Sequence, residues 1–107
     1  MAYEEEYAER VRALLDGEPG ITEKRMFGGL AFLVDGHMAL AISGRGLLMI
    51  RADESTQERL LDRPGVEQTI MRQRPMRNWL DIDETVTGDE AELASLVRGA
   101  VAHVRTL

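Results

Sequence analysis

The chain has 107 residues, of which 44% are hydrophobic and 30% are charged, and it contains no cysteine. This length and composition predict one folded domain that spans residues 1–107. The absence of cysteine excludes disulfides, thiolate nucleophiles and cysteine-based metal sites. Thirteen Lys and Arg against nineteen Asp and Glu give a net charge of −6. DNA phosphates would be repelled by the domain as a whole, so we expect no direct DNA binding.

The N-terminus, MAYEEEYAERV, is acidic, whereas a secretory signal needs basic residues followed by an apolar run. The longest apolar runs, at residues 30–34 and 38–42, are far shorter than the roughly 20 residues that cross a bilayer. We therefore expect a cytoplasmic protein without a membrane segment.

In the first half of the chain, a helical repeat of apolar residues predicts a helix over residues 3–16, which Gly17 and Pro19 end. Asp35 and Gly36 separate two apolar runs and predict a two-residue type I′ hairpin turn that pairs Val34 with His37. The pattern predicts four antiparallel strands, at residues 23–27, 30–34, 37–42 and 47–51.

In the second half, the spacing of Ser55 and Glu58 is that of a capping box and predicts a helix over residues 56–62. Residues 66–71 and 78–83 alternate like strands. Thr87 and Glu90 repeat the capping box before a final helix, whose apolar stripe is Leu93, Leu96, Val97, Ala100, Val101 and Val104. The predicted order is one helix, four strands, one helix, two strands and one helix. This is an α+β domain whose helices cover one face of an antiparallel sheet.

Gly28 and Gly29 lie between two predicted strands rather than between a strand and a helix. The amides of a helix N-terminus are therefore absent there, and a phosphate-binding loop is disfavoured. The favoured interpretation is a bulge, a bend or a close backbone contact. A loop that contacts a ligand is the alternative.

The residues that could carry chemistry are few, and no catalytic motif connects them. The serines lie outside the motifs of nucleophilic catalysis, and the histidines lack the spacing of metal ligands. We therefore expect no catalytic residue, no metal and no cofactor. The residues considered are Ser43, Ser55, Ser95, His37, His103, Asp81, Asp83 and Glu84.

One segment is basic, with Arg63, Arg72, Arg74 and Arg77 opposed only by Glu67, a local balance of +3. Arginine forks suit carboxylate or phosphate acceptors, so the segment is a candidate docking surface. The alternative is a solvated loop whose charge is balanced by the acidic residues that follow it.

Several segments together resemble the N-terminal domain of the TfoX/Sxy family: "EKRMFGGLAFLVDGHMALAI", "LLMIRAD", "RPG" and "RPMRNWLDID". The resemblance implies an α+β fold similar to secretion-chaperone-like domains, and a regulator of competence genes that assists a cyclic-AMP receptor protein at promoters. The chain ends at Leu107, where those regulators continue into a helical domain, so a stand-alone N-terminal domain is expected. The family supplies no catalytic motif.

The leading hypothesis is a non-enzymatic regulatory domain that binds a protein partner, such as the transcription machinery, through Arg72, Arg74 and Arg77. The second is a small-ligand domain with a pocket between sheet and helices. Its expected site residues are Phe27, Gly28, Gly29 and Trp79. A catalytic function is the third hypothesis. A homodimer formed through an open sheet edge is a further alternative.

Overall fold

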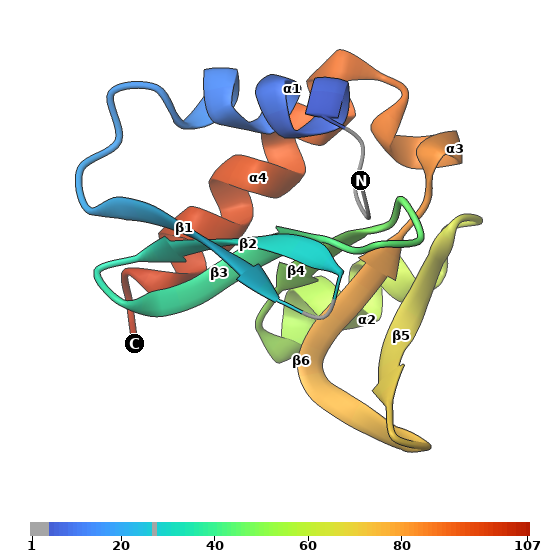
Figure 1. Cartoon of the computed structure of the whole chain (residues 1–107). Coiled ribbons are helices and arrows are strands. Elements are labelled where there is room, and N and C mark those ends of the chain that lie inside the picture. The colour runs from blue at the N-terminus through green and yellow to red at the C-terminus, as the bar shows by residue number, and fades with distance from the viewer. Residues whose placement is uncertain (1–4, 27) are drawn as a thin grey trace.

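The computed structural model describes residues 5–26 and 28–107 (Figure 1). The α+β class is confirmed, and the element order differs from the prediction only by one additional short helix. Tyr3 and Glu4, the first residues of the predicted helix, lie outside the described part. The elements are α1 (Glu5–Leu15), β1 (Ile21–Met26), β2 (Gly29–Val34), β3 (His37–Ile42), β4 (Leu48–Arg51), α2 (Glu54–Leu61), β5 (Val66–Met71), β6 (Arg74–Ile82), α3 (Glu84–Thr87) and α4 (Glu90–Val104).

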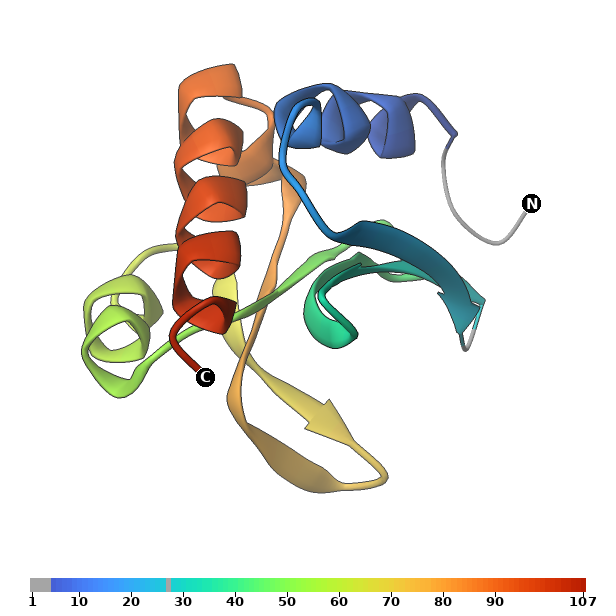
Figure 2. The ribbon, with the colours of Figure 1, turned by 90° about the vertical axis from the view of Figure 1, so that its left-hand side faces the viewer.

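The six strands form one antiparallel sheet in the order β1-β2-β3-β4-β6-β5. After β4 the chain forms α2, runs along the far edge of the sheet as β5 and returns as β6 beside β4. The sheet therefore has two parts, a meander of β1 to β4 and a hairpin of β5 and β6. In Figures 1 and 2 this hairpin extends away from α1 and α4.

The helices α1 and α4 pack against each other and cover one face of the sheet (Figure 1). Alternate strand residues point into the core beneath them, because successive side chains of a strand point to opposite faces. In β6, Leu80 and Ile82 belong to this core while Trp79 and Asp81 do not, as the alternation predicts. The predicted stripe of α4 is buried in full, so both periodicities are confirmed.

The predicted hairpin turn at Asp35 and Gly36 is also confirmed. Both residues have positive φ, 50° and 87°, and Val34 pairs with His37. A type I′ turn requires positive φ at both central positions, which Asp and Gly tolerate better than most residues.

The predicted start of α2 is wrong by two residues. Its N-cap is Asp53, whose Oδ1 accepts a hydrogen bond from the backbone N–H of Thr56 at 2.8 Å. The Ser55 hydroxyl donates to the same Oδ1 at 3.2 Å instead of capping the helix. The chain has two residues suited to capping there, and the carboxylate takes the role.

The predicted cap of the last helix is wrong for the same reason. Thr87 is buried at the end of α3, and its hydroxyl donates to the carbonyl of Asp83 at 3.3 Å. The N-cap of α4 is Asp89, whose Oδ1 accepts from the N–H groups of Ala91 and Glu92 at 2.8 and 3.3 Å. The unpredicted helix α3 has only four residues.

The strand boundaries show one large error and several of one or two residues. β6 begins at Arg74 rather than Asn78, so the segment that looked like a basic loop is paired backbone. Pro75 is tolerated near a hairpin end, where a missing N–H costs least. β1 begins at Ile21, two residues early, β2 begins at Gly29, one residue early, and β4 begins at Leu48, one residue late. β6 ends at Ile82, one residue before its predicted end.

An ion-pair network joins α1 to the edge strand β1. The Arg12 guanidinium donates two hydrogen bonds to the Glu23 carboxylate, at 2.8 and 2.9 Å, and also contacts Glu5 and Glu9. These bonds hold the pKa of the Glu23 carboxyl below its usual value. The network is largely exposed, so its contribution to stability is small.

No helix in residues 5–26 or 28–107 combines the length and the apolar character needed to cross a membrane.

Replacing Asp89 with Ala should lower the free energy of unfolding by about 1 kcal/mol, because two backbone N–H groups lose their acceptor. Asp89→Asn keeps an acceptor oxygen and should stay close to the parent. Urea denaturation followed by circular dichroism measures both. Equal stability of the Ala variant and the parent would contradict the cap assignment.

Candidate interaction surface

The β5–β6 hairpin carries the three arginines that the sequence singled out. Met71 pairs with Arg74 and Ile70 with Pro75, so Arg72 and Gln73 form a two-residue turn. We call residues 70–77 the hairpin tip. The tip contains no Asp or Glu, so its charge is entirely positive.

The turn itself is strained. Arg72 and Gln73 have φ values of 52° and 65°, a region that costs an L-residue with a Cβ about 1–2 kcal/mol relative to glycine. Two-residue turns of this kind normally use Asn-Gly or Asp-Gly. The chain instead has two long polar side chains at the end of the hairpin, one of them a cation. Strain of this kind is often found at functional sites.

The arginines of the tip are available for contact. Arg72, Arg74 and Arg77 are all exposed, and none forms an ion pair or a side-chain hydrogen bond with another described residue. Arg63 differs, because its Nη1 lies 2.7 Å from Oε2 of Glu92 on α4. The basic segment predicted from the sequence is therefore reduced to three arginines on one hairpin.

An apolar side chain lies among these charges. Ile70 is 61% exposed and pairs with Pro75, which is also exposed. Met71 and Met76 are half-buried next to them. Exposed apolar groups bordered by arginine are typical of protein contact surfaces, where Arg and Met are enriched. The sequence pattern did not single out Ile70.

Side-chain amides fix the base of the hairpin. Asn78 has a φ of 70°, and its Oδ1 accepts from Nε2 of Gln57 on α2 at 3.0 Å. Nε2 of Gln68 donates to the carbonyls of Met76 and Trp79, at 2.7 and 2.9 Å. These bonds satisfy backbone groups where the β5–β6 register shifts, so the hairpin leaves the sheet in a defined direction.

Trp79 lies on the sheet face that points away from the core and is 9% exposed. The guanidinium of Arg51, its partner on β4, lies 5.9 Å from the ring centroid, within cation–π distance. On the same strand, Asp81 accepts a hydrogen bond from Thr69 at 2.7 Å. Trp79 thus packs against its neighbours within the sheet.

Gly28 and Gly29 do not lie beside Trp79, so the structure does not bring these predicted ligand-site residues together. Gly29 lies beside Ile42 at one end of the β3–β4 ladder, and Trp79 lies beside Arg51 at the other end. Gly28 is in the β1–β2 turn with a φ of 78°. Phe27, the remaining residue of the predicted ligand site, lies outside the described residues.

Gly29 has a clear structural role. A Cβ at this position would lie well inside contact distance of the Ile42 carbonyl oxygen and 3.1 Å from Cα of Ser43. Both are backbone atoms of the sheet, so they cannot move away from the new methyl group as a flexible side chain could. This is a close backbone contact, one of the three structural roles that the sequence favoured over a ligand-binding loop.

The other candidates serve local structure. Ser43 Oγ accepts from the N–H groups of Arg45 and Leu47, Asp83 caps α3, and Glu84 is the first residue of α3. His37 is exposed, whereas His103 is half-buried on α4. Within the described ranges, no three His, Asp or Glu side chains are placed to hold a metal ion.

These features define a small α+β domain with helices on one face of an antiparallel sheet and a cationic hairpin at its edge. Residues 13–104 match the family model described as the TfoX N-terminal domain. The match covers most of the chain, which therefore belongs to this family. A search of curated proteins found no match.

Replacing Gly29 with Ala should destabilise the domain by about 1–3 kcal/mol, because the new methyl group overlaps fixed backbone. Gly99→Ala is the matched control. Gly99 is in the interior of α4, and a Cβ there would meet no atom within 4 Å. Gly99→Ala should therefore stabilise the domain by about 0.5–1 kcal/mol. Chemical denaturation of both variants measures the difference. Equal stabilities would contradict the close contact at Gly29.

Replacing Gln73 with Gly should raise the free energy of unfolding by about 0.5 kcal/mol, because glycine adopts positive φ without steric strain. Arg74→Gly is the control, since Arg74 is strand backbone without positive φ. That change should destabilise by about 0.5–1 kcal/mol. Thermal and urea denaturation report both values, and the same sign for both changes would contradict the assigned turn.

Proposed function

We propose that this chain is a non-enzymatic regulatory domain that binds an acidic surface on another protein through its hairpin tip. The observation that carries the proposal is the group of three exposed arginines without ion-pair partners in the described structure, set around the exposed Ile70. Opposite charge steers the encounter, and apolar contact adds affinity once the surfaces meet.

The rest of the molecule supports a protein partner over DNA. The chain carries a net charge of −6, which opposes approach to a phosphate backbone. A partner with a local acidic patch would contact the projecting tip while the rest of the acidic domain stays away from it. Membership of the TfoX N-terminal domain family supports a regulatory role, and we propose a cytoplasmic component of the transcription machinery as the partner.

Affinity capture from nuclease-treated lysate tests the proposal. A tagged parent chain should retain a specific protein, and the variant with Arg72→Gln, Arg74→Gln and Arg77→Gln should retain ~10-fold less, since three exposed charge contacts are lost. Purified partner and chain should then show the same loss by calorimetry, together with weaker binding at high salt.

A matched variant controls for the change in net charge. Lys24, Arg25 and Arg98 are exposed away from the tip, and changing all three to Gln removes the same charge. This control should bind as the parent does, and Ile70→Ser should bind more weakly. Equal losses in both triple variants, or retained binding in the hairpin variant, would overturn the proposal.

A further inference from the structure

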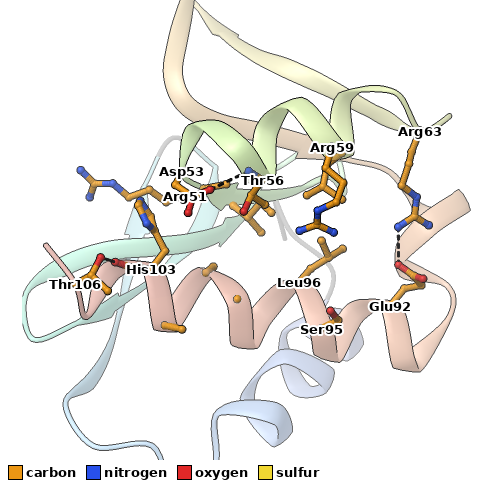
Figure 3. Close-up of a pocket in the computed structure, with 16 residues that line it drawn as sticks. Arg51, Asp53, Thr56, Arg59, Arg63, Glu92, Ser95, Leu96, His103 and Thr106 are labelled. Carbon is orange, nitrogen blue, oxygen red and sulfur yellow. Dashed lines mark hydrogen bonds and ion pairs between the residues drawn. The ribbon is translucent and has the colours of Figure 1, made fainter.

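A groove lies between α2 and α4, next to the end of β4 (Figure 3). Its volume is about 510 Å³, and ligand sites in proteins usually measure about 300–1,000 Å³. The groove is separate from the hairpin tip, and none of Gly28, Gly29 and Trp79 lines it.

The floor of the groove is apolar. Ile50 from β4, Leu60 from α2, and Leu96 and Ala100 from α4 line it, and all four are buried. At Gly99 a Cβ would meet nothing within 4 Å, which shows that space lies beside this turn of α4. An apolar floor of this kind can bury one side of a flat organic group.

The centre of the groove holds the cation of Arg59. Arg59 extends from α2 toward Leu96 on α4 (Figure 3), and it has no ion pair or hydrogen bond with any residue the structure describes. Arg63, one turn later, is satisfied by Glu92 at 2.7 Å. That ion pair closes one end of the groove. Among the described residues, Arg51 also lines the groove without an ion pair. Its guanidinium, however, donates a hydrogen bond to the carbonyl of Met38 at 3.3 Å and lies over the Trp79 ring.

The other end holds mixed charges. His103 lies between the helices beside Arg51 and Asp53 (Figure 3). Asp53 caps α2, and the N–H of Thr56 holds the pKa of its carboxyl below the usual value. This carboxylate repels an anion, so an anionic ligand is best placed near the centre, at Arg59, rather than at this end.

We propose that the groove binds a small organic anion, a carboxylate or a phosphate monoester on a flat apolar body. The Arg59 guanidinium receives the anionic group, because its fork of N–H donors matches the oxygens of both acceptors. The apolar body lies on Leu60, Leu96 and Ala100. The hydroxyls of Thr56 and Ser95, which also line the groove, can accept or donate hydrogen bonds at its edges. This site is independent of the proposed partner surface.

Amide NMR titrations of the whole chain test the site with four probes. Phenyl phosphate and benzoate carry a phosphate and a carboxylate on the same phenyl ring. The probe that binds more tightly identifies the anionic group that the site prefers. Benzyl alcohol lacks the charge and inorganic phosphate lacks the body. We expect saturable shifts at Thr56, Arg59, Ser95, Gly99 and His103 with at least one aromatic anion. Benzyl alcohol and inorganic phosphate should each bind at least ~10-fold more weakly than the preferred aromatic anion.

Two variants locate the binding. Arg59→Gln should weaken binding of the preferred anion ~10-fold, the loss expected for one charge-assisted contact. Arg98→Gln removes the same charge from α4 outside the groove, on the side near Leu14 and Leu15 of α1, and should leave binding unchanged. Gly99→Leu places a large side chain in the groove at a helical position where leucine is favourable. This variant should also bind the preferred anion more weakly. Absence of saturable shifts with both aromatic anions, or equal affinity in Arg59→Gln and the parent, would overturn the site.

Discussion

The pairing of β4 with β6 is the constraint on which the rest of the structure depends. It joins the β1 to β4 meander to the β5–β6 hairpin across the connection that α2 makes. Ile50 pairs with Leu80 and Leu48 with Ile82, and all four are almost fully buried beneath the helices. Because strands alternate, this register also places Trp79 on the opposite face and directs the first half of β6 out of the sheet.

Much of the fold could be predicted because local patterns agree with it. The buried stripe of α4 and the Asp35-Gly36 turn depend on residues close in sequence, and both are present. The errors arise where several local solutions compete. The observed helix caps are Asp53 and Asp89, whereas Ser55 and Thr87 were predicted. Each segment contains more than one side-chain acceptor, and tertiary packing selects between them.

The candidate surface was only partly visible in the sequence. Charge segregation pointed to Arg72, Arg74 and Arg77, but a strained turn of Arg and Gln carries none of the usual hairpin signals. The position of Ile70 opposite Pro75 follows from strand register, which the sequence pattern did not provide. The groove at Arg59 is less visible still, because α2 and α4 approach one another only through tertiary packing and more than thirty residues separate Arg59 from Leu96.

Helix α2 borders both surfaces, yet it keeps them physically separate. Gln57 holds Asn78 at the base of the hairpin, whereas Arg59 points into the groove (Figure 3). Residues two apart on a helix do not share a face, so the side chain at 59 can change without removing the hydrogen bond at 57. The hairpin is further fixed by Gln68 from β5, which does not contact the groove. A loss of anion binding and a loss of partner binding therefore report on different parts of the molecule.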